Sequence, residues 1–217
     1  MTRFRLVRRS IPVTVLCIAV SLTGCQTMGE NASSGTMIGG VLGCLGGAAI
    51  ASATGGKPGV GCAAGAALGA VSGYYVGRKK DMDLALKAQN DIRRLQADAD
   101  VKLVTARQDV PEGDRGQVGG ASSIEVLNSM VVSVPHGRVA RKEQGAIDAL
   151  GRVGNYVSEA QATSRIVVGA RSKAEYDFMV ESIQKGYTRD TRPPKVTFEY
   201  QQLARSTQAT VEVRHIA

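Results

Sequence analysis

Glycine recurs at every fourth position in two charge-free segments of this 217-residue chain, residues 31–56 and 58–77. Glycine in a helix costs about 1 kcal/mol relative to alanine, so a strict repeat needs a compensating benefit. Small residues on one helix face let two helix backbones approach closely. The spacing therefore predicts two helices packed through glycine faces, built on Gly35, Gly39, Gly43, Gly47, Gly61, Gly65, Gly69, Gly73 and Gly77.

The two segments are joined by a turn-forming stretch at residues 55–59, which contains three glycines and Pro58. This pattern resembles the glycine-zipper two-helix hairpins of small bacterial envelope proteins, and we expect the hairpin over residues 35–77. Each arm is near the roughly 30 Å that spans a bilayer, although it is only mildly hydrophobic. A membrane-associated hairpin is favoured over a soluble oligomeric hairpin or a flexible linker, because linkers lack such periodicity.

Two cysteines, Cys44 and Cys62, lie one on each arm of the predicted hairpin. A turn centred near Gly56 places Cys44 opposite about residue 68, roughly 9 Å along the axis from Cys62. An oxidising compartment permits a disulfide. The spacing nevertheless favours small buried residues over a disulfide at these positions.

The first 24 residues have the features of a signal peptide: four arginines, no acid, and an apolar stretch at residues 11–22 that is too short to span a bilayer. The sequence Leu22-Thr23-Gly24-Cys25 resembles the lipobox of bacterial lipoproteins, which implies acylation of Cys25 as the new N-terminus. The alternative is an ordinary secretory signal with a chance cysteine. Gln26 follows in place of aspartate, so the resemblance implies an outer-membrane protein with a stable lipid anchor. Residues 25–34 are then the anchor and tether.

After the hairpin, residues 78–110 are charged and favour helix, beginning with the basic run Arg78-Lys79-Lys80. Apolar residues at alternating spacings of three and four predict a coiled-coil seam or a docked helix, so we expect a helical spacer. Residues 111–121 contain four glycines and predict a flexible linker.

Residues 122–217 change to a pattern of strand, helix, strand, helix, strand and strand, which predicts a small α+β domain with one sheet face under two helices. Behind a lipobox and a glycine zipper, this βαβαββ order resembles the OmpA-like domain that holds outer-membrane proteins to peptidoglycan. Gly169 matches the family motif, but Ser172 stands where the ligand-gripping aspartate belongs. The motif arginine of the second helix is also missing. No peptidoglycan-binding residue therefore carries over.

Arg171 is the candidate ligand-binding residue of this domain, since it follows the second strand near the expected mouth and a guanidinium suits carboxylates. Surface solvation is the alternative role. The two histidines, His136 and His215, lie far apart and argue against a multi-histidine metal site. We expect no metal, no cofactor besides the lipid on Cys25, and no enzymatic activity, because no catalytic or phosphate-binding motif is present. Removing residues 1–24 halves the net charge of +8, which weakens a nucleic-acid interpretation.

Two functions fit these features about equally. The first is an outer-membrane lipoprotein with a structural and binding role, held by lipid and glycine zipper, whose periplasmic domain contacts the cell wall. The second is an accessory lipoprotein of an envelope-spanning secretion or conjugation machine, whose C-terminal domain docks on protein. A purely structural oligomer is a third. The expected partners are outer-membrane lipid, peptidoglycan or machine proteins, and further copies of the chain through the zipper.

Overall fold

A computed structural model describes residues 30–95, 98–188 and 193–215. The predicted signal peptide and Cys25 lie outside these residues. The described chain begins with two long antiparallel helices, α1 (Glu30–Ala53) and α2 (Pro58–Arg93). Pro58 occupies the first turn of α2, where its missing N–H costs nothing. Gly55 adopts a positive φ of 78° in the turn between the helices, a conformation that glycine reaches without strain.

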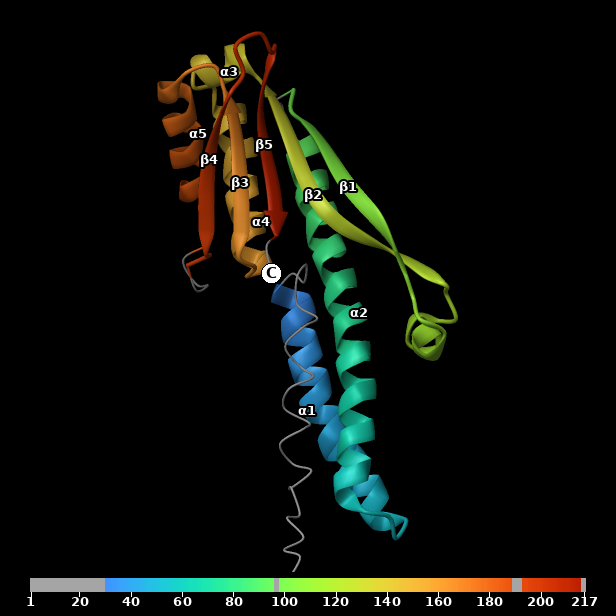
Figure 1. Cartoon of the computed structure of the whole chain (residues 1–217). Coiled ribbons are helices and arrows are strands. Elements are labelled where there is room, and N and C mark those ends of the chain that lie inside the picture. Colours follow the sequence, from blue (N-terminus) through green and yellow to red (C-terminus); the bar gives the residue numbers. More distant parts are fainter. Residues whose placement is uncertain (1–29, 96–97, 189–192, 216–217) are drawn as a thin grey trace, which may run out of the picture.

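The remaining elements form a five-stranded mixed sheet with helices on one face (Figure 1). The strand order is β1-β2-β5-β3-β4, and only the β3–β4 pair is parallel. The strands are β1 (Asp100–Asp109), β2 (Ser123–Pro135), β3 (Ser164–Ala170), β4 (Val196–Gln202) and β5 (Gln208–His215). The helices are α3 (His136–Ala140), α4 (Gln144–Ala160) and α5 (Lys173–Lys185), with a 3-10 helix, η2, at Glu112–Val118.

The α+β class and the predicted strand and helix order after residue 122 are confirmed, with the short helix α3 as an addition. Alternate residues of the central strands point into the core, as the period of a half-buried strand requires. Val132 and Val134 of β2 and Val211 of β5 are fully buried there. They pack against Leu150 and Val153 of α4, and the core therefore lies between the sheet and its helices.

The predicted helical spacer over residues 78–110 is wrong in its second half. The helix ends at Arg93, and residues 100–109 form the edge strand β1, paired antiparallel with β2. The β-branched residues Val101, Val104 and Thr105 suit a strand, and pairing with β2 decides between the two local preferences. The first half is helical, but it is not a spacer, because Ala85, Ala88 and Ile92 are buried in the domain core.

The predicted flexible linker at residues 111–121 is also replaced by ordered structure. These residues connect β1 to β2 as the end of a β-hairpin, and η2 forms within them. The Val110 N–H donates to the carbonyl of Ser122 at 2.9 Å and closes this loop. The sheet domain therefore begins on α2 and not at residue 122, and the hairpin and the domain share one continuous 36-residue helix.

Candidate functional site

The contact between α1 and α2 is a backbone-to-backbone interface made by glycines. Four facing pairs form it: Gly35 with Gly73, Gly39 with Gly69, Gly43 with Gly65, and Gly47 with Gly61. A Cβ atom added to the α1 member of any pair would lie 2.0–2.1 Å from the carbonyl oxygen of its partner. No side chain fits there, which explains why the repeat is so strict. Gly77, the last glycine of the predicted ladder, is buried on α2.

The structure joins Cys44 and Cys62 in a disulfide, contrary to the expectation of two separate small residues. Their Cα atoms are 3.8 Å apart. The glycine pairs set a register in which Cys44 lies level with residue 64, and not with residue 68. The difference is four residues, about one helical turn. The position of the turn in the sequence did not predict this shift, because the close packing of the glycine pairs sets the register of the two helices.

The outward face of the hairpin is apolar and unburied in the single chain. Nine large apolar side chains there are 57–73% exposed: Met37, Ile38, Val41, Leu42, Leu45, Ile50, Val60, Leu68 and Val76. Both helices have the length and apolar composition of membrane-crossing segments, and the apolar window of each is at most 6% buried. A continuous exposed apolar surface of this kind marks contact with lipid or protein.

Polar and aromatic groups gather where the hairpin meets the domain. Tyr74 donates its hydroxyl to the side chain of Gln108 on β1 at 2.8 Å, and Arg78 donates to the Tyr74 oxygen at 3.1 Å. The Arg78 guanidinium also lies 5.2 Å from the centre of the Tyr74 ring. Ser72 is hydrogen-bonded to Gln117 of η2, which places this charged loop beside α2 at the same level. The continuous apolar surface therefore gives way to polar contacts near residue 72, and exposed Val76 lies about one helical turn beyond this point on α2.

Arg171, the candidate ligand-binding residue, lies at the end of the domain that carries α3, opposite to the hairpin (Figure 1). It lines a pocket of about 410 Å³ between α3 and α5. Its guanidinium donates to the carbonyl of Ser206 at 2.8 and 3.3 Å, and its backbone N–H donates to Glu175 at 2.7 Å. The side chain is thus held by the protein, beside the pocket.

His136 shares this pocket, and sequence reasoning had not singled it out as a site residue. It is buried, and its Nδ1 lies 2.5 Å from Glu175 Oε1. Its Nε2 is buried and has no hydrogen-bond partner among the described residues. Ser172, which stands where the family motif has aspartate, caps α5 by accepting from the Glu175 N–H at 3.2 Å. Only the tertiary structure brings the end of β2 beside the start of α5, so no local signal could have linked His136 to Glu175.

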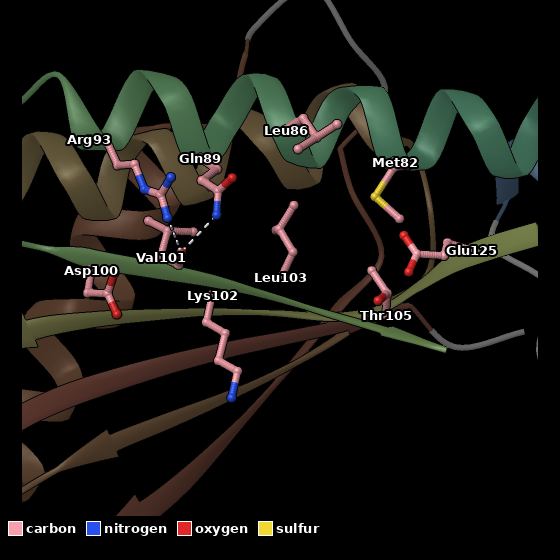
Figure 2. Close-up of a pocket in the computed structure, with 10 residues that line it drawn as sticks. All are labelled: Met82, Leu86, Gln89, Arg93, Asp100, Val101, Lys102, Leu103, Thr105 and Glu125. Carbon is pink, nitrogen blue, oxygen red and sulfur yellow. Dashed lines mark hydrogen bonds between the residues drawn. The ribbon is translucent and has the colours of Figure 1, made fainter. Parts of the chain in front are cut away.

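A second pocket, of about 590 Å³, lies between α2 and the edge strand β1 (Figure 2). Met82 and Leu86 of α2 line it together with Leu103 of β1. At one end, Gln89 and Arg93 both donate to the carbonyl of Val101, at 2.8 and 3.3 Å. These bonds tie the free edge of the sheet to α2. This groove was not predicted, because residues 78–110 were expected to form a single helix.

The fold and these contacts show what class of protein this is: its glycine-zipper hairpin is continuous with a small α+β domain. Residues 7–81 of the chain match the family model of the YMGG-like Gly-zipper. No curated protein and no solved structure matches the chain. The family match supports the glycine-zipper prediction, and together with the apolar helices it indicates a membrane-associated protein. The match leaves the sheet domain uncovered.

Proposed function

We propose that the chain is an outer-membrane lipoprotein with a structural and binding role. It is held in the membrane by acyl chains on Cys25 and by the glycine-packed hairpin, and its sheet domain contacts the cell wall from the periplasm. The observation that carries the proposal is the apolar outward face of a hairpin whose inner face is already filled by glycine contacts. The proposal includes no catalytic step and no cofactor other than the covalent lipid.

The lipid anchor is supported by the sequence around Cys25 and by its distance from the hairpin. Only four residues separate Cys25 from Glu30, where α1 begins. Acyl chains on Cys25 would therefore enter the bilayer beside the first turn of α1. Each buried CH₂ contributes about 0.8 kcal/mol, so several chains and an apolar hairpin together make a stable anchor.

Lipidation and location are tested by growing cells that express the full chain with a labelled fatty acid and separating their membranes by density. We expect acyl label on the wild type in the outer-membrane fraction and none on Cys25→Ser. Cys17→Ser, within the signal peptide, is the matched control and should keep its label. An unlabelled wild type would refute the lipoprotein proposal, whereas labelled protein in the inner membrane would refute only the location.

Contact with the cell wall is supported by the pocket that Arg171, Lys142 and His136 line at the end of the domain away from the hairpin. The test is co-sedimentation of the detergent-solubilised full chain with isolated peptidoglycan. We expect binding by the wild type and by Arg165→Ala, a change on an exposed arginine of the sheet, and at least tenfold weaker binding by Arg171→Ala. Equal binding by the two variants would show that Arg171 does not take part in the contact with the cell wall.

The alternative is an accessory lipoprotein of an envelope-spanning secretion or conjugation machine. It is favoured by the absence of the family's aspartate and arginine, and by the groove between α2 and the edge strand β1. If the wild type fails to sediment with peptidoglycan, this alternative leads. Crosslinking from Leu86, which is 41% exposed in the groove, then identifies the protein partner.

A further inference from the structure

We infer that the hairpin crosses the hydrocarbon layer completely, with its turn at the opposite membrane face, and that α2 holds the sheet domain upright on the side of Cys25 with the α3 end facing away. This inference rests on the membrane association of the proposed function and adds the orientation of every part. It follows from the length of the apolar surface, the groups at its two ends, and the continuity of α2.

The length of the apolar surface matches a bilayer. Charged η2 lies beside Ser72, and in the glycine register residue 72 is level with residue 36 of α1. From residue 36 to the end of α1 at Ala53 the helix rises about 26 Å. A typical hydrocarbon core is about 30 Å thick, and bacterial outer membranes are thinner than average. The hairpin therefore fits across the layer once, without excess length.

The turn end of the hairpin is suited to the far headgroup region. Lys57 is the only charged residue between residues 31 and 77, and it lies in the turn between α1 and α2. The neighbouring Thr54 and Gly55 are exposed. A lysine at this point is costly inside hydrocarbon and favourable at the far headgroups. A hairpin lying flat on the near surface would also leave part of its apolar circumference in water.

The other end of the hairpin carries the groups found at a membrane–water interface. Tyr74 is partly exposed here, with its ring edge to face against buried Tyr75 at 5.3 Å between ring centres, and tyrosine is enriched at headgroup depth. Arg78, Lys79 and Lys80 follow within the next turn and a half of α2. Glu30, where α1 begins, is at this same end because the helices are antiparallel. Cys25 and the sheet domain consequently share one side of the membrane.

The continuity of α2 fixes the domain relative to the bilayer. The helix runs unbroken from Pro58 to Arg93, and Asp81, Ala85 and Ile92 on its second half are buried in the domain. From Arg78 to Arg93 it rises about 22 Å. The α3 end, with the Arg171 pocket, stands at the far end of the domain from the hairpin (Figure 1). The pocket is therefore presented to the periplasm, about that distance from the headgroups.

The test is labelling of single added cysteines in the full chain with a membrane-impermeant maleimide in intact cells that have two membranes. Thr54→Cys reports on the turn, and Ala204→Cys, in the exposed turn between β4 and β5, reports on the α3 end. We expect Thr54→Cys to label in intact cells to at least half the level reached in detergent. Ala204→Cys should stay at background until the outer membrane is permeabilised, and then label fully.

Each of the other outcomes contradicts one part of this inference. If Thr54→Cys labels only after permeabilisation, the turn lies in the periplasm. If it labels only in detergent, the turn stays within the hydrocarbon. In both cases the crossing is wrong while the protein remains membrane-associated. Labelling of Ala204→Cys in intact cells would show that the domain lies on the outer side of the membrane, opposite to the inferred orientation. Membrane fractionation of the same cells separates these results from failure of the proposed function, in which the chain leaves the membranes altogether.

Discussion

At the scale of single residues, the hairpin depends on the absence of side chains at chosen positions. Gly43 and Gly46 are three residues apart on α1, yet their surroundings are opposite. A Cβ on Gly43 would lie 2.0 Å from the carbonyl oxygen of Gly65, whereas a Cβ on Gly46 meets nothing within 4 Å. The two glycines therefore form a matched pair for mutation.

We expect Gly43→Ala to force the helices apart and to lower the yield of the Cys44–Cys62 disulfide severalfold, because the two sulfur atoms then no longer meet. Gly46→Ala should leave the yield unchanged, and it favours the helix by up to about 1 kcal/mol. Trapping free thiols in membranes, followed by non-reducing electrophoresis, measures the yield. Equal yields from both variants would contradict the register described above.

A second residue-scale property is the acid sensitivity of the domain. Tyr156 and Ser164 hydrogen-bond the two ring nitrogens of His215, at 2.7 and 3.0 Å. Burial, and to a lesser extent the positive charge of Arg78, lowers the pKa of His215 to about 4. The unfolded chain, with a pKa near 6.5, binds a proton that the folded chain does not, so stability falls as pH drops from about 6.5 towards 4.

His215→Gln should remove most of this acid-dependent loss, which we expect to be on the order of 1–3 kcal/mol in the wild type. The measurement is the free energy of unfolding in denaturant at several pH values between 7 and 4, for wild type and variant. Parallel pH curves for the two proteins would show that His215 is not responsible.

At the scale of elements, α4 and α5 cross at a second glycine contact, unrelated to the ladder. A Cβ on Gly154 would lie 1.9 Å from the carbonyl oxygen of Ile183, and a Cβ on Gly186 would lie 1.9 Å from that of Gly151. A Cβ on Gly151 itself meets nothing within 4 Å. The pairing of these helices over the sheet therefore depends on Gly154 and Gly186.

Gly154→Ala should lower the free energy of unfolding of the domain by about 1–3 kcal/mol, because the helices must separate to admit the methyl group. Gly151→Ala, one helical turn away, should be neutral or stabilising by up to about 1 kcal/mol. Chemical denaturation followed by circular dichroism compares them. A Gly154→Ala protein as stable as the Gly151→Ala protein would refute the close crossing.

At the scale of the whole molecule, the end of α2 and the strand β1 belong to the sheet domain. Ile92 and Val101 are at most 1% exposed and lie in the same core as Met130 and Leu150. Burying an aliphatic side chain contributes about 1.5–3 kcal/mol. A fragment of residues 78–217 should thus unfold cooperatively, whereas residues 122–217 should be several kcal/mol less stable and bind hydrophobic dye. Equal unfolding midpoints for the two fragments would place the boundary back at residue 122.

The sequence alone was sufficient for features that repeat locally. The ladder from Gly35 to Gly73 predicts its helix pair, because glycine at every fourth position lowers helix stability unless two helices pack closely through it. The alternation of apolar and polar residues in β5 and the helical spacing of apolar residues in α5 predict the later elements. Each of these burial patterns lies within one continuous segment of the chain. The prediction failed at residues 100–109, where Val101 and Leu103 become a strand only because β2 is available to pair with them.

Three features were decided by the tertiary structure alone. The hairpin register brings Cys44 to Cys62, because glycine contacts between distant residues set it and the position of the turn does not. The cluster of His136, Glu175 and Arg171 exists because the end of β2 and the start of α5, about 40 residues apart in sequence, lie together at the same end of the sheet. The union of hairpin and domain depends on which face of α2 is buried. Each is a relation between segments far apart in the chain, which local spacing does not encode.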